Sequence, residues 1–158
     1  MKKFAFRYQT LLEVRERRKK TEEEKLQVLT AEVLSHEAEL QRLQSEENAQ
    51  LAAWTAMQRD GALDLQQMVL YQEYFQRMEQ RRNRQAERVE DARARVLNQR
   101  EVLVLAHQEL RAIETLKERD FKAWNDAVEK AEADMLDELA TVRYARRDGV
   151  SRPNESPG

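Results

Sequence analysis

The sequence predicts an all-α fold, an elongated antiparallel two-helix coiled-coil hairpin. Helix breakers are scarce, with three glycines and two prolines in 158 residues, and all of them except Gly61 lie in the last ten positions. Ala, Glu, Lys, Leu and Arg make up 87 of the 158 residues, a composition typical of long helices and coiled coils. The missing turn residues exclude a β-sandwich, and the missing glycines exclude a Rossmann or P-loop fold.

The first helix is expected at about residues 4–58, which contain neither Gly nor Pro. Seven of ten heptad positions counted from Leu26 are apolar, which indicates a coiled-coil stripe. The positions are Leu26, Leu29, Val33, His36, Leu40, Leu43, Glu47, Gln50, Trp54 and Met57. Upstream, residues 15–25 hold no apolar residue, so we expect little burial there.

A turn at about residues 59–63 is predicted by Asp60-Gly61, and a second helix by residues 64–146. Eleven of fourteen heptad positions from Met68 to Ile113 are apolar, and the pattern then shifts by four residues. The shifted stripe consists of Phe121, Trp124, Val128, Ala131 and Met135. Residues 1–147 are expected to form one antiparallel coiled-coil domain, and residues 148–158 a disordered tail.

Two registers are compatible with this hairpin. A tight turn at Gly61 places residues 22–47, with eight acids and two bases, beside residues 75–100, with eight arginines and four acids. It leaves about 25 C-terminal residues unpaired, with Phe121 and Trp124 among them. The alternative register pairs the two chain ends and folds residues 59–90 as a cap. Charge favours the tight turn.

Catalytic chemistry is not expected. Cysteine is absent, and two paired helices offer no concave pocket in which nucleophiles or carboxylates could converge, so we predict no enzyme and no cofactor. His36 and His107 have no second histidine one turn away, which favours partly exposed interface residues over a metal site. The N-terminus resembles no signal peptide and no apolar run could span a membrane, so the expected compartment is the cytoplasm.

Two clusters are candidates for partner contacts. The basic run at 15–20 has no interleaved aromatic residues and is followed by three glutamates, so a solvated face or an acidic protein partner is favoured over nucleic acid. The densest apolar cluster is Tyr71, Tyr74, Phe75 and Met78. Tyr74 lies off the heptad stripe, so core packing and docking remain equal alternatives.

Four motifs follow one another along the chain: FAFRYQTLLEVRER from Phe4, YQEYFQRME from Tyr71, LRAIETLKER from Leu110, and LDELA from Leu136 followed by Arg143. These motifs and their order resemble the patterns of the FliJ family of bacterial flagellar export proteins. The resemblance covers about residues 4–147.

The resemblance implies a non-enzymatic stalk of the flagellar type III protein export apparatus that couples the ATPase to the export gate. The implied partners are the hexameric export ATPase, the large export-gate membrane protein and export chaperones, with no nucleic acid and no membrane insertion. It implies a monomer in the cytoplasm, peripherally associated with the inner membrane at the flagellar base, with a role in flagellum biogenesis and motility.

The resemblance also suggests contact residues. For the export gate they are Tyr71, Tyr74, Phe75, Met78 and Arg81. For the ATPase ring they are Phe4, Tyr8, Leu11, Leu12, Arg15, Arg17, Arg18, Lys19, Lys20, Trp124, Met135, Leu136 and Leu139. The alternatives are the equivalent stalk of a virulence secretion system and a generic coiled-coil scaffold, which would self-associate through the C-terminal stripe.

Overall fold

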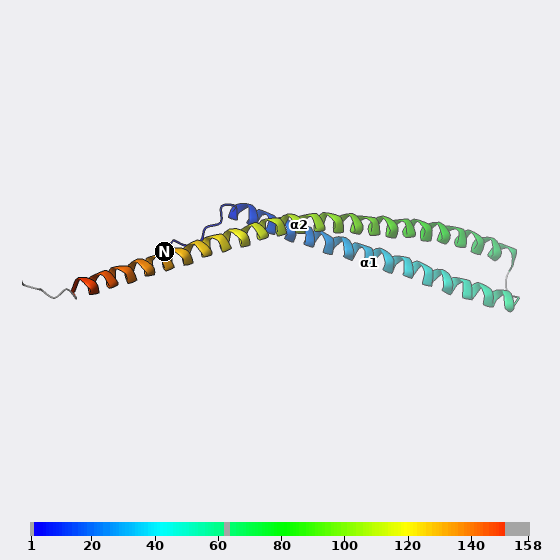
Figure 1. Cartoon of the computed structure of the whole chain (residues 1–158). Coiled ribbons are helices and arrows are strands. Elements are labelled where there is room, and N and C mark those ends of the chain that lie inside the picture. The colour runs from blue at the N-terminus through cyan, green and yellow to red at the C-terminus, as the bar shows by residue number, and fades with distance from the viewer. Residues whose placement is uncertain (1, 62–63, 151–158) are drawn as a thin grey trace, which may run out of the picture. The chain divides into compact units, whose positions relative to one another are not determined.

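The computed structural model describes residues 2–61 and 64–150, and it consists of two long antiparallel helices (Figure 1). Helix α1 spans Gln9–Arg59 and helix α2 spans Leu65–Val150. Those described residues contain no β-strand. The predicted all-α helical hairpin is therefore confirmed. Contacts divide the chain into two compact units, one of residues up to 13 with those from 110 onward, the other Val14–Glu109.

The start of α1 corrects the predicted helix at residue 4. Residues 2–6 are not helical, and a turn at Arg7 and Tyr8 precedes the helix. Phe6 is buried with Leu12, Leu110 and Ile113, and Phe4 packs against the same cluster. Two residues apart, Phe4 and Phe6 would point in different directions from a helix, so the non-helical segment lets both side chains pack.

At the other end, α2 continues to Val150, so residues 148–150 of the predicted tail are helical. The remainder of that tail, 151–158, lies outside the described residues. The single domain 1–147 stays a prediction.

The core of the Val14–Glu109 unit follows the predicted heptads. Every predicted position on α2 from Met68 to Ile113 is buried or half-buried except Met68, and on α1 only Gln50 and Met57 are exposed. The most buried apolar side chains in this unit are Leu43, Met78, Val89, Ala92, Val96 and Ala106. Full burial of a side chain the size of leucine or methionine stabilises the fold by about 1.5–3 kcal/mol.

Polar side chains also enter the interface, including the stretch 15–25 where little burial was expected. Glu22 is only 8% exposed and accepts hydrogen bonds from Gln99 and Lys25. The hydrogen bond from Gln99 is the main cause that lowers the pKa of Glu22. Gln85, 3% exposed, donates through Nε2 to the His36 carbonyl at 2.9 Å. Buried polar groups of this kind need partners at fixed positions.

Ion pairs across the helices establish the tight register. Glu47 pairs with Arg82 at 2.7 Å, Glu37 with Arg93 at 2.8 Å, and Glu32 with Arg95 at 3.5 Å. These three ion pairs join the acidic block 22–47 to the arginine block 75–100. The alternative register, with residues 59–90 as a cap, is therefore wrong.

The turn has capping signals on both sides. Gly61 has a φ of +66°, the left-handed conformation that commonly ends a helix, and its N–H donates to the Gln58 carbonyl at 3.3 Å. Asp64 accepts a hydrogen bond from the Gln67 N–H at 2.8 Å, and the Gln67 side chain accepts one from the Asp64 N–H at 3.4 Å. This reciprocal capping box starts α2. Residues 62 and 63, within the predicted turn, lie outside the described residues.

Candidate partner-binding surfaces

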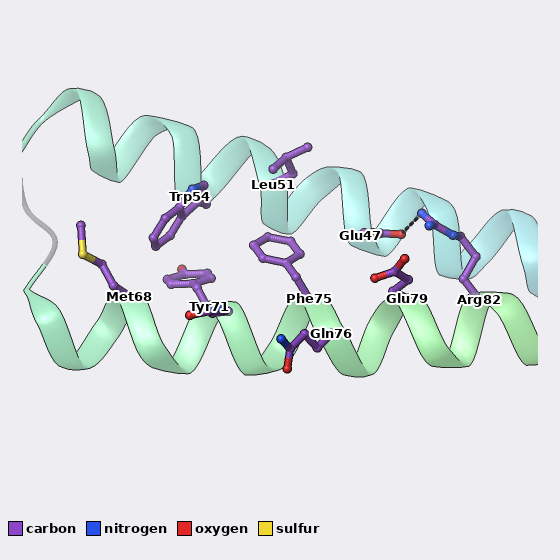
Figure 2. Close-up of a pocket in the computed structure, with 10 residues that line it drawn as sticks. Glu47, Leu51, Trp54, Met68, Tyr71, Phe75, Gln76, Glu79 and Arg82 are labelled. Carbon is purple, nitrogen blue, oxygen red and sulfur yellow. Dashed lines mark hydrogen bonds and ion pairs between the residues drawn. The ribbon is translucent and has the colours of Figure 1, made fainter.

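A cleft of about 680 Å³ opens between α1 and α2 near the turn (Figure 2). We call it the turn-proximal cleft. It is lined by Glu47, Leu51, Trp54, Met68, Tyr71, Gln72, Phe75, Gln76, Glu79 and Arg82. The Tyr71 ring stands between two other aromatic rings, 5.1 Å from Trp54 and 6.2 Å from Phe75 between centroids.

The cleft combines an apolar floor with charged groups at one end. Leu51 is 50% exposed and Met68 is 41% exposed, so both can be covered by a partner. Figure 2 shows the Glu47–Arg82 ion pair beyond Phe75. Because apolar area is flanked by charge, the cleft suits an apolar side chain on a partner whose surroundings are polar.

The predicted gate residues fall in different environments. Tyr71 and Phe75 line the cleft and are half-buried. Met78 is 2% exposed and fills the interface, so it is not available for direct contact. Arg81 is exposed. Sequence reasoning placed Trp54 and Met68 on the heptad stripe, but did not recognise that the register brings them together with Tyr71 in a cleft.

Tyr74 is half-buried outside the lining of the cleft. Its ring packs edge-on against Phe75 at 5.4 Å, and its hydroxyl is buried without a hydrogen-bond partner among the described residues. Burial raises the pKa of Tyr74, and the nearby carboxylates of Glu46 and Glu47 raise it further. An unpaired buried hydroxyl of this kind costs free energy, and no external partner can reach it in this conformation.

A second surface lies on α2, towards its C-terminal end. Val128, Ala131, Met135, Leu139 and Val142 recur at helical spacing, and we call them the terminal apolar stripe. All residues from 131 to 150 are exposed. The upper part of the stripe borders a hollow of about 330 Å³ lined by Lys2, Trp124, Val128, Ala131, Glu132 and Met135.

The structure corrects the length of the unpaired segment. Phe4 lies 5.3 Å from Phe121 and 5.8 Å from Trp124 between ring centroids, so these two residues, expected to be unpaired, are packed within the chain. Phe121 is still 48% exposed despite this packing, and beyond Trp124 the apolar side chains Met135 and Leu139 are 62% and 48% exposed.

The predicted ring residues therefore divide into packed and exposed sets. Leu12 is 4% exposed and belongs to the core, and Phe4 is half-buried in the aromatic cluster. Tyr8, Leu11, Met135, Leu136 and Leu139 are exposed, and Trp124 is half-buried at the edge of the hollow.

The basic run is largely engaged within the hairpin. Arg15 donates to the Glu109 carbonyl and Arg18 to the Glu109 carboxylate, each at 2.8 Å, while Lys19 pairs with Glu23 at 3.7 Å. The exposed side chains of Arg17 and Lys20 make no ion pair with any residue that the structure describes. These two are the members of the run that a partner can reach.

The model of one protein family, described as flagellar FliJ protein, matches residues 4–149. The chain belongs to the FliJ family. A search of the curated proteins and a search of the solved structures each found no match. The resemblance deduced from the sequence motifs is thus confirmed, and a role in flagellar export, in contact with other components of the export apparatus, follows from membership.

Membership also settles the class of activity, because FliJ proteins are non-enzymatic coupling proteins. Within the described parts of this FliJ chain, no group of three or more His, Asp or Glu side chains is arranged to hold a metal ion. His36 contacts Gln85, as expected for an interface residue, whereas His107 is exposed. No helix in those parts has the length and apolar character needed to cross a membrane.

Proposed function

We propose that this FliJ-family chain is the stalk that couples the hexameric export ATPase to the export gate. In this role the terminal apolar stripe binds the ATPase ring, and the turn-proximal cleft binds the large export-gate membrane protein. The protein also escorts export chaperones. It acts in the cytoplasm, associated peripherally with the inner membrane at the flagellar base.

The observation that carries the proposal is the exposed apolar surface on α2. Met135, Leu136 and Leu139 are 62%, 66% and 48% exposed on a helix where every residue from 131 onward is exposed. A contiguous apolar surface of this kind costs free energy in water and marks a protein-binding site. A ring with an apolar lining would cover it.

The gate contact is supported by the turn-proximal cleft and by Tyr74. The cleft exposes Leu51 and Met68 above an aromatic floor, and the Tyr74 hydroxyl has no partner among the described residues. The hydroxyl itself is buried, so a partner reaches it only when the helices shift locally on binding, and a hydrogen bond formed in that way would offset the cost of the unpaired group. Arg81 is exposed and close enough to Tyr74 to act on its pKa, and its charge suits an acidic group of the gate.

Co-sedimentation with the cognate export ATPase tests the proposal. Leu139→Asp places a charge in the terminal apolar stripe and should weaken ring binding by about tenfold or more, since a buried unpaired carboxylate is costly. Ala133→Asp is the matched control, because it adds the same charge to the same exposed helix about 120° around its axis. Equal binding by the two variants, or no binding by the unmodified chain, contradicts the stalk assignment.

A further inference from the structure

The exposed end of α2 has a charge pattern that is complementary to itself. Residues 129–138 contain five acids and one lysine, whereas residues 139–147 contain three arginines and no acid. The terminal apolar stripe runs through both halves. The acidic half therefore precedes the basic half along one helix.

We propose that, when it is not bound to the ATPase ring, this chain pairs with a second copy of itself through the terminal apolar stripe, with the two α2 helices antiparallel. The competition rests on the proposed function, because the second copy and the ATPase ring would bind the same stripe. Pairing would keep the stripe covered until a ring displaces the second copy.

Charge selects the antiparallel orientation. When Met135 of each copy lies beside Leu139 of the other, Glu129 and Glu132 of one helix face the segment with Arg143 and Arg146 of the other. Glu132, Arg143 and Arg146 make no ion pair within the described residues, so all three are available. A parallel pair would instead place acids beside acids and arginines beside arginines, which is unfavourable at flanking coiled-coil positions.

The size of the surface indicates a weak, reversible dimer. The 20 residues of α2 from 131 to 150 are all exposed, equivalent to roughly 30 Å of helix. Two helices of this length meeting along one stripe bury less area than a standard stable interface, so dissociation at low concentration follows. A partner with a larger complementary surface, such as a ring, can replace the second copy.

Sedimentation equilibrium of the full chain alone provides the first test. The unmodified chain should dimerise in a concentration-dependent way. The double change Arg143→Glu with Arg146→Glu should weaken dimerisation by about tenfold or more, because it places acids opposite acids. Adding Glu129→Arg and Glu132→Arg to that variant restores opposite charges and should restore the dimer. A monomer at all concentrations, or no rescue by the charge exchange, overturns the proposal.

Disulfide mapping tests orientation, because the chain has no cysteine of its own. A mixture of Met135→Cys and Leu139→Cys chains should form mixed disulfides under mild oxidation. Val128→Cys should not pair with itself, since the two copies of residue 128 would be separated by roughly 27 Å along the antiparallel helices. Self-pairing of Val128→Cys indicates a parallel dimer and contradicts the proposal.

Ring binding is measured separately, so the two proposals can fail separately. If the unmodified chain dimerises and binds no ATPase, the stalk proposal fails while the antiparallel dimer holds. If it binds the ATPase and never dimerises, the dimer is wrong and the stalk proposal holds. If both are seen, excess ATPase should convert the dimer into ring-bound monomer, and a dimer that persists on the ring contradicts the competition.

Discussion

Replacing Tyr74 by Phe removes a single oxygen atom from a position where the structure gives that atom no partner. The hydroxyl is buried and has no hydrogen bond among the described residues, while the ring packs edge-on against Phe75 at 5.4 Å. Tyr74→Phe keeps the ring in place. The change therefore isolates the energetic effect of the hydroxyl.

The magnitude follows from the cost of an unsatisfied polar group, about 1–3 kcal/mol. Tyr74 as a whole is half-buried, which places it at the low end of that range. We expect Tyr74→Phe to raise the free energy of unfolding by about 1 kcal/mol at neutral pH. Urea unfolding followed by circular dichroism measures it. The control is Tyr144→Phe, which removes a hydroxyl from a side chain that is 70% exposed and should leave stability unchanged.

The difference between Tyr74→Phe and the unmodified chain should also grow at high pH. Burial raises the pKa of Tyr74 above the value of 10.0 expected in the unfolded chain. The folded state then holds a proton that the unfolded state has lost, so stability falls as the pH rises above about 10. Phenylalanine carries no such proton. A loss of stability in Tyr74→Phe at neutral pH would show that the hydroxyl has a partner, and would refute the reasoning.

Two further substitutions test the polar interface and the turn. Glu22→Gln should lower stability at pH 7. The lowered pKa of Glu22 means that its stabilisation is complete above pH 4.5 and is lost progressively below it, so the deficit should shrink as the pH falls. Unfolding in urea at pH 7 and pH 3 checks this, with the exposed Glu24→Gln as control, and an unchanged deficit contradicts it. Gly61→Ala should lower the free energy of unfolding by about 1 kcal/mol, because φ at Gly61 is +66°. Gly149→Ala is the control, since a Cβ would meet no other atom at either site but only Gly61 has a left-handed backbone. Equal stability of the two variants in urea unfolding would count against a strained turn.

The heptad repeat made most of the fold predictable. Apolar residues every three or four positions located the buried face of both helices, and the opposite charges of 22–47 and 75–100 selected the tight register. The start of α1 could not be predicted in this way. Phe4 and Phe6 pack on residues more than a hundred positions later in the chain, a long-range contact that no local pattern records.

The surfaces were only partly predictable for the same reason. Exposed apolar residues beyond the paired part of α2 follow from the unequal helices, and Met135, Leu136 and Leu139 were identified from sequence. Spacing alone could not separate Met78, which is 2% exposed, from its neighbour Tyr74, whose hydroxyl is buried but unpaired. That distinction depends on how the side chains of α1 cover each position.

The polar residues of the interface determine which apolar residues stay available to partners. Sliding α2 by one heptad would keep apolar stripe against apolar stripe, because both repeat every seven residues. It would, however, replace Gln99 with Ala92 or Ala106 opposite Glu22, and leave that 8%-exposed carboxylate without its hydrogen bond from the other helix. Lys25 on α1 would still donate to Glu22, but without the hydrogen bond from Gln99 this carboxylate would lose a partner, and such registers are disfavoured.

The same argument applies to the other polar contacts. A slide of seven residues would place Phe75 or Val89 where Arg82 now pairs with Glu47, and Met78 or Ala92 where Gln85 now bonds to His36. Each lost polar contact raises the free energy of the shifted register, so the observed register is favoured over its neighbours. Because α1 begins at Gln9 and α2 continues to Val150, that register leaves the last part of α2 without α1 beside it. With 86 residues in α2 and 51 in α1, part of α2 has no α1 beside it in any register, and the polar residues of the interface determine where that part begins.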